Sequence, residues 1–147
     1  MHAQSSAGLP ATAFFSRTYD EALGLLYAAR DYLKFEAEQD WRRLAPAIGL
    51  ACTTETTRLT ARLTNMMAWL LLQRAVHAGE ITWDEARQEA PQLGGIGVCL
   101  SAAEIDPAAL PQRFGRLLEQ SRNLYRRVAR LDEMMRRDVA APAGGVS

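Results

Sequence analysis

The sequence predicts an all-α fold: an antiparallel bundle of three long helices, with one short extra helix between the second and third long helices. The strongest observation is a heptad pattern in the C-terminal third, where apolar residues recur at alternating spacings of four and three. A similar pattern occurs near the N-terminus, and no segment shows the two-residue period of a strand. The C-terminal seam consists of Leu110, Phe114, Leu117, Ser121, Leu124, Val128, Leu131 and Met135.

The first long helix is expected to begin near Phe14 or Ser16 and to fade between Glu38 and Trp41, before Pro46. The residues that precede it are small and polar, which is typical of a loose N-terminal arm. The helix has its own seam, formed by Phe15, Tyr19, Ala22, Leu26, Ala29 and Leu33. The predicted organisation is a disordered arm over residues 1–13, a helical bundle domain over residues 14–138 and a flexible tail over residues 139–147.

The second long helix is expected to run from Pro46, or from the threonines that follow it, to His77. Gly79 is a plausible residue to end it, because glycine readily adopts the left-handed conformation found after helices. Six threonines lower the helix propensity, so packing against other helices must stabilise it. Its main apolar stripe consists of Leu59, Leu63, Met66, Met67 and Leu70.

A capping box marks the short helix, with Thr82 as the N-cap and Glu85 three residues later, and this helix should end before Pro91. The glycines at 94, 95 and 97 then predict a flexible connection. Asp106 and Pro107 are expected to start the heptad helix as its N-cap and first residue.

Composition and charge are those of a soluble globular protein with no net charge. The charges are unevenly placed, since residues 76–106 are acidic and residues 113–137 are rich in arginine, and these segments are expected to pair with each other. The chain has 16 arginines and one lysine, a bias typical of a GC-rich genome. Cys52 and Cys99 are isolated and no signal peptide is visible, so we expect reduced thiols and a cytoplasmic location.

The sequence offers little for catalysis or metal binding. His2 lies in the predicted arm, and His77 stands alone at a helix end, where a cation favours the helix dipole. Neither cysteine has a histidine close by in sequence, and the glycines at 94–97 lack the strand and lysine of a phosphate loop. We therefore predict a protein that is not an enzyme and that has no catalytic residues, cofactor or metal.

Trp69, Leu72 and Val76 suggest a second apolar face on the second helix, roughly opposite its main stripe. Two explanations account for such a face. The short helix from Thr82 to Glu89 could fold back over this face, or the face could form a homodimer or partner interface, where tryptophan is enriched.

Two stretches resemble a known protein family. Residues 57–63 read TRLTARL, and residues 68–76 read AWLLLQRAV, followed by Gly79-Glu80-Ile81-Thr82. Together with Leu110-Pro111 and residues 124–132, which read LYRRVARLD, they resemble the alphaproteobacterial "regulator of CtrA degradation" (RcdA) family. The resemblance covers residues 50–138, and the N-terminal third has no matching motif.

The resemblance implies a homodimeric helical bundle that acts as an adaptor for the ClpXP protease and delivers cell-cycle regulators together with other adaptor proteins. The arginine face around Arg122, Arg126 and Arg130 would then attract acidic partners. Two alternatives remain open. One is a nucleic-acid-binding protein that uses the same arginine face, which zero net charge disfavours. The other is a helical bundle that senses a small molecule held between its helices.

Overall fold

The structure is a computed structural model that describes the backbone of residues 3–89, 93 and 105–140, with side chains described for residues 13–89, 93 and 105–138. Within these ranges every regular element is a helix and no strand occurs, so the all-α class is confirmed. The elements are α1 (Ala3–Phe35), α2 (Ala37–Arg42), α3 (Pro46–His77), α4 (Trp83–Glu89), the short 3-10 helix η2 (Pro107–Ala109) and α6 (Gln112–Ala140).

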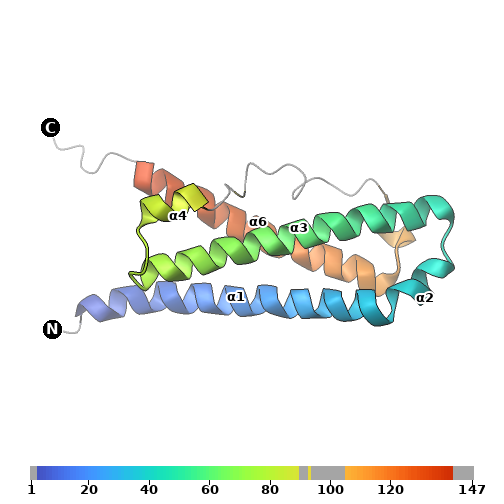
Figure 1. Ribbon diagram of the computed structural model, residues 1–147, viewed down its shortest axis with the longest axis horizontal. Coiled ribbons are helices and arrows are strands. Elements are labelled where there is room, and N and C mark those ends of the chain that lie inside the picture. The colour runs from blue at the N-terminus through green and yellow to red at the C-terminus, as the bar shows by residue number, and fades with distance from the viewer. Residues whose placement is uncertain (1–2, 90–92, 94–104, 141–147) are drawn as a thin grey trace.

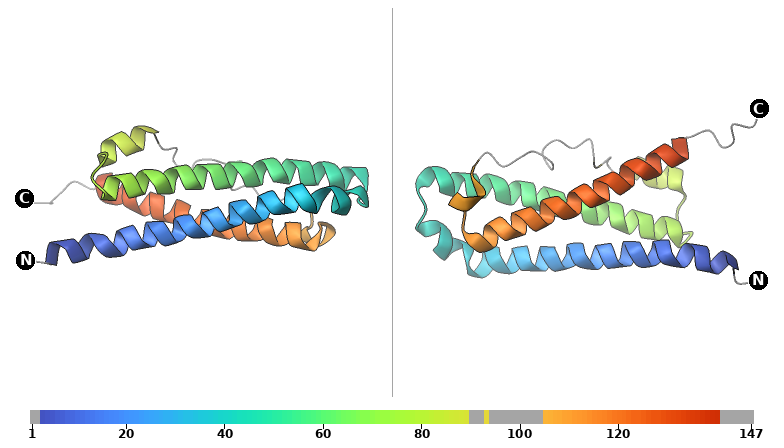
Figure 2. Two further views of the ribbon diagram at one scale, coloured as in Figure 1. Left: turned by 60° about the horizontal axis from the view of Figure 1, so that its bottom comes forward. Right: turned by 180° about the vertical axis from the view of Figure 1, so that it is seen from behind.

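The three long helices α1, α3 and α6 pack against one another in pairs (Figures 1 and 2). Helix α3 runs antiparallel to α1, since the Phe15 ring near the start of α1 lies 5.9 Å from the Trp69 ring near the end of α3. Helix α6 runs parallel to α3, because Glu55 contacts Arg122 while Trp69, further along α3, contacts Asp132, further along α6.

The expectation of a fully antiparallel bundle is therefore wrong for the pair α3 and α6. The connection explains the difference. Helix α3 has 32 residues and is about 48 Å long at the usual rise. The chain between Ala78 and Pro111 is long enough to travel this distance back before α6 begins. As a result, α1 begins and α6 ends at the same end of the bundle (Figure 1).

The N-terminal helix differs from the expectation at both ends. It begins at Ala3 instead of near Phe14, so part of the segment expected as an arm is helical. Its alanines favour helix, whereas Gly8 and Pro10 disfavour it, so helix propensity alone does not account for this extension. At the other end, the chain breaks at Glu36 and continues as the separate short helix α2.

Helix α3 has the predicted bounds, Pro46 to His77, and Gly79 follows it with a φ of +76°. This left-handed conformation is the one that favours glycine after a helix. The predicted N-cap of α4 is also confirmed, because the Thr82 Oγ1 accepts the Glu85 backbone N–H at 3.1 Å, while the Glu85 carboxylate accepts from the Thr82 hydroxyl instead of from its backbone N–H.

The predicted start of the heptad helix is wrong by one short element. Asp106 caps η2, with its Oδ1 accepting the Ala108 N–H at 3.0 Å, and α6 begins only at Gln112. The reason is Pro111, whose ring disfavours helical backbone at the preceding residue. Leu110 is accordingly extended, with a ψ of 154°. Cys99, the glycines at 94, 95 and 97, and residues 141–147 lie outside the described residues.

The core follows the predicted seams. Six of the eight residues of the C-terminal seam are buried, and the last two, Leu131 and Met135, are half-buried. An aromatic cluster closes the core at the α2 end, where the Phe114 ring lies 5.5 Å from Tyr32 and 5.4 Å from Trp41.

Candidate functional site

A buried carboxylate on α6 links three parts of the chain. Asp132 accepts hydrogen bonds from the Trp69 indole Nε1 at 2.8 Å, from the Leu93 backbone N–H at 3.2 Å and from the Arg136 Nε at 2.9 Å. The Tyr125 hydroxyl donates to the Leu93 carbonyl at 2.9 Å, so both backbone groups of Leu93 bond to α6. A buried charge is stable only with such partners. The arrangement therefore secures both α3 and the chain after α4 to α6.

A second buried carboxylate lies nearer the other end of α3. Glu55 pairs with Arg58 on its own helix at 2.7 Å and with Arg122 on α6 at 2.8 Å. Two turns beyond Glu55 on α3, the buried Arg62 donates from Nε to the Ser121 hydroxyl at 3.0 Å. The only polar residue in the α6 seam is thus an acceptor for an arginine of α3. These contacts shape the bundle rather than a reactive site.

The structure places Trp69 inside the single chain, with 0% of its surface exposed. The residue lies only about 60° around the helix from Met66, at 3.6 residues per turn, so it belongs to the buried side and not to an opposite face. It packs edge-on against Phe15 of α1 as well as bonding Asp132. Burying this ring requires no second copy of the chain. Leu72 and Val76 are half-buried, and their role in an interface stays a prediction.

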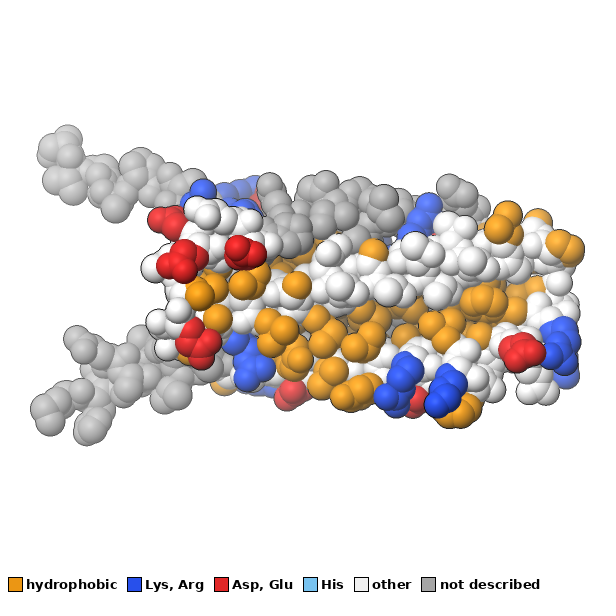
Figure 3. Space-filling view, viewed as in Figure 1, with side chains coloured by type: hydrophobic (Ala, Val, Ile, Leu, Met, Phe, Trp, Pro, Cys, Tyr) orange, Lys and Arg blue, Asp and Glu red, His pale blue; other side chains and the backbone are white. Residues whose placement is uncertain are grey.

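The outer face of α3 is the surface that the sequence analysis missed. Between Pro46 and Gln73, no exposed residue of α3 is charged, and Arg74 is the first exposed charge. Figure 3 shows this face, with apolar side chains gathered along the line between α3 and α1. An exposed helix face normally carries charges for solvation. The exposed residues are Pro46, Ala47, Leu50, Thr53, Thr54, Thr57, Thr60, Thr64, Ala68 and Leu71.

Four of the five threonines on this face donate their hydroxyl hydrogen within α3. Thr53, Thr54, Thr57 and Thr60 each donate to the backbone carbonyl four residues earlier, at distances from 2.9 to 3.3 Å. This back-bonding leaves each hydroxyl with a partner in its own helix. The face can therefore lose water at lower cost than its composition implies. Alternation of threonine with small residues at helical spacing was the sequence signal for this surface.

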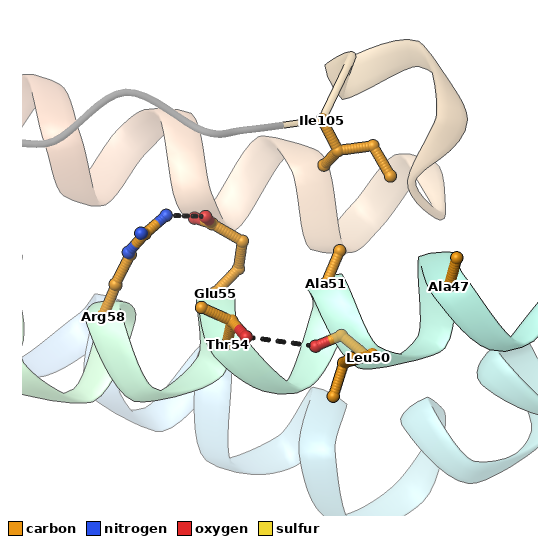
Figure 4. A pocket seen from close by; sticks show the side chains of 7 residues that line it. All are labelled: Ala47, Leu50, Ala51, Thr54, Glu55, Arg58 and Ile105. Atoms are coloured by element: carbon orange, nitrogen blue, oxygen red, sulfur yellow. Dashed lines mark hydrogen bonds and ion pairs between the residues drawn. The ribbon is translucent and has the colours of Figure 1, made fainter.

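A shallow pocket of about 170 Å³ lies at the start of this face, between α3 and Ile105 (Figure 4). Ala47 and Ala51 form its small apolar wall, and the Glu55–Arg58 ion pair closes one end. Leu50 at its edge is 69% exposed. The pocket has room for one apolar side chain from another protein, beside a paired carboxylate that is already neutralised.

The arginines of α6 divide into those that pair with a carboxylate and those that have no carboxylate partner among the described residues. Arg122, predicted as part of an electrostatic face, is only 15% exposed and is paired with Glu55. Arg126 and Arg130 are exposed as expected, and Arg116 joins them one to two heptads earlier. The remaining arginines of this helix pair with carboxylates of α1, of the α1–α2 junction or of α6 itself, namely Arg113 with Glu36, Arg127 with Glu21, Arg136 with Asp132 and Arg137 with Glu133.

The acidic segment, residues 76–106, does not neutralise the arginines of α6 within the described residues. The ion pair formed in that segment is local, between Arg87 and Asp84 at 3.9 Å. Its described carboxylates at 80, 84, 85, 89 and 106 make no ion pair with α6. The expected pairing of the acidic and basic segments is therefore not seen in this part of the chain, and Arg116, Arg126 and Arg130 face solvent.

Two buried titratable groups of the core, Cys52 and Tyr32, have raised pKa values. Burial, with the nearby Glu55 carboxylate adding to it, raises the pKa of the Cys52 thiol, which disfavours the reactive thiolate. Burial also raises the pKa of Tyr32, whose hydroxyl donates to Asp40 at 3.0 Å. Among the described residues, no group of three or more metal-ligating side chains occurs. None of the described helices is long and apolar enough to span a membrane.

Comparisons with known proteins agree with this architecture. The family described as "Protein of unknown function (DUF1465)" matches residues 8–146. The crystal structure of RcdA from Caulobacter crescentus CB15 is 35% identical in sequence, with a TM-score of 0.65. The match covers 82% of this chain and 89% of that one. No curated protein matches the sequence.

Proposed function

Because this chain belongs to the DUF1465 family of RcdA-like proteins, we propose that it is a non-enzymatic adaptor that delivers cell-cycle regulators to the ClpXP protease in the cytoplasm. The observation that carries the proposal is the extent of the likeness to RcdA, at 35% identity over 82% of this chain. The longer family motifs quoted from the sequence lie on α3 and α6. These motifs supply the bundle's internal contacts, since Trp69, Gln73 and Arg62 are all buried. The adaptor role then depends on the outer faces of the bundle.

The uncharged face of α3 is the best candidate for self-association. A two-fold dimer would place this face against its own copy, so that small side chains allow the two helices to approach closely. Charged groups are depleted in the cores of protein interfaces, and α3 shows this depletion from Pro46 to Gln73. The pocket beside Leu50 and Ala51 would accept an apolar side chain of the second copy.

The exposed arginines of α6 are the best candidate for attracting acidic partners. These arginines, Arg116, Arg126 and Arg130, lie on α6, whereas the uncharged face lies on α3. One molecule could therefore self-associate and bind an acidic partner at the same time. Charge complementarity of this kind mainly raises the rate of association and selects the partner. Binding to nucleic acid has less support, because Arg113, Arg122, Arg127, Arg136 and Arg137 are paired within the chain.

A charge placed in the middle of the α3 face tests the proposed dimer. Thr60→Arg should shift the protein towards monomer in analytical ultracentrifugation, because a charge would be buried at the centre of the interface. Gln120→Arg is the matched control, since it places the same side chain on the exposed surface of α6. Equal sedimentation of the two variants and the unmodified protein would reject the α3 interface.

The adaptor role is tested by capture from the native host. Tagged protein should retain subunits of the protease and a small set of regulators, identified by mass spectrometry, and purified ClpXP should degrade those regulators faster when the protein is added. Unchanged degradation rates for every captured regulator would reject the delivery function. They would leave the self-association result unaffected.

A further inference from the structure

A second pocket, of about 370 Å³, lies between η2 and α6. One wall is a single face of α6, because Gly115, Leu118, Arg122 and Arg126 follow one another at helical spacing. Leu110 provides the opposite wall. The pocket therefore combines an apolar base with two guanidinium groups one turn apart.

The two arginines of this pocket have N–H groups that make no contact within the described residues. Arg122 uses its Nη2 for Glu55 at 2.8 Å, and its Nε is buried without an acceptor among the described residues. Arg126 is exposed and makes one long contact, from Nη1 to the Asn123 Oδ1 at 3.5 Å. A guanidinium carries five N–H donors and binds carboxylates well. The two arginines can thus bind an anionic group of another molecule.

The carboxylate of Glu119 restricts which anionic ligand can bind in this pocket. Glu119 lines the same space and would repel a simple anion such as phosphate. A ligand that fits must bring a carboxylate for Arg122 and Arg126, an N–H donor for Glu119, and an apolar side chain for Leu110 and Leu118. The last residue of a polypeptide has all three groups next to one another.

We propose that this pocket binds the C-terminal residue of a partner polypeptide that ends in an aliphatic side chain. The α-carboxylate lies against Arg122 and Arg126, the final backbone N–H donates to Glu119, and the side chain packs on Leu110 and Leu118. The volume suits one or two residues, not a folded surface. This site is separate from the proposed dimer face, and its occupation requires neither a protease nor a second copy.

Two synthetic peptides with a fluorescent label test the proposal by anisotropy with the full-length protein. One ends Gly-Ser-Ala-Leu with a free carboxylate, and the other has the same sequence with a C-terminal amide. The free acid should bind at least about tenfold more tightly, because charge-assisted hydrogen bonds are lost with the amide. Equal binding of the two peptides, or no binding of the acid, would overturn the proposal. An amidated peptide with aspartate beside the leucine should bind weakly, and binding equal to the free acid would likewise overturn it.

Variants locate the binding to the pocket. Gly115→Met should weaken binding at least about fivefold by filling the space, whereas Gly115→Ala should not, because an added Cβ would lie 3.7 Å from the Pro107 carbonyl oxygen, an ordinary contact. Arg126→Gln should weaken binding similarly. Its control is Arg130→Gln, one turn further along the same helix and outside the pocket. Circular dichroism confirms folding of each variant. Equal losses for Arg126→Gln and Arg130→Gln would mean general charge attraction and would refute the site.

Discussion

Removing the carboxylate of Asp132 should destabilise the protein strongly, because three donors lose their acceptor together. Two of these donors, the Trp69 indole N–H and the Leu93 backbone N–H, are buried and would find no water. Each buried donor left without a partner costs about 1–3 kcal/mol. The third donor belongs to Arg136, whose side chain is 23% exposed and can turn to solvent. Asp132→Ala should therefore lower the free energy of unfolding by about 2–6 kcal/mol.

The neighbouring residue supplies the matched control. Glu133 pairs with Arg137 on the surface of the same helix, with 56% of its side chain exposed. Glu133→Ala should change the free energy of unfolding by about half a kcal/mol or less. Urea denaturation followed by circular dichroism measures both variants. Equal effects, within experimental error, would refute the assignment of Asp132 as the buried acceptor of this bundle.

A double-mutant cycle isolates the contact with the indole. Trp69→Phe removes the N–H and keeps most of the ring, so the two changes together should cost less than the sum of the single changes, by about 1 kcal/mol or more. Additive effects would show that Trp69 and Asp132 do not interact. Sedimentation of Trp69→Phe should match that of the unmodified protein, since the ring is internal.

Three further predictions concern packing, helix propensity and the buried thiol. Leu124→Ala should lower the free energy of unfolding by about 2–5 kcal/mol, against about 0.5 or less for Arg126→Ala, both measured by urea denaturation. Gly24→Ala should raise it by about 0.5–1 kcal/mol, because the position is exposed within α1 and an added Cβ meets nothing within 4 Å; a lower melting temperature would contradict this. In a Cys99→Ser background, Cys52 should react with a thiol reagent far more slowly in buffer than in urea. Because burial raises the pKa of this thiol, its contribution to stability is complete below its ordinary pKa of 9.0 and is lost as the pH rises towards the folded value. Cys52→Ala should therefore reduce the decline in stability above pH 9.

The helices could be predicted because apolar residues recur at helical spacing along the sequence. The α6 seam and the bounds of α3 follow from spacing and from Pro46 and Gly79 alone. The direction of α6 could not be predicted in this way, because an apolar seam packs equally well in either orientation. Only the length of the connection from Ala78 to Pro111 carried that information.

The buried polar contacts were beyond sequence reasoning for a different reason. Asp132 reads as one acid within a basic helix, and its indole partner lies 63 positions away. The spacing of residues on a single helix predicts an outer face for Trp69. Helix α3 in fact packs against both α1 and α6, so apolar residues around much of its circumference are internal. Arg122 was assigned to solvent because Glu55, its partner, lies on another helix.

The polar contacts between α3 and α6 have a consequence for the alignment of these two parallel helices. A heptad seam repeats every seven residues, so sliding α6 along α3 by one heptad, about 10 Å, would still bring apolar side chains together. The same slide would separate Arg122 from Glu55, Ser121 from Arg62 and Asp132 from Trp69, so that both buried carboxylates would lose their contact with the other long helix. Only one alignment of α6 along α3 satisfies all three contacts. These polar contacts therefore fix a single register that the repetitive apolar seam alone does not specify.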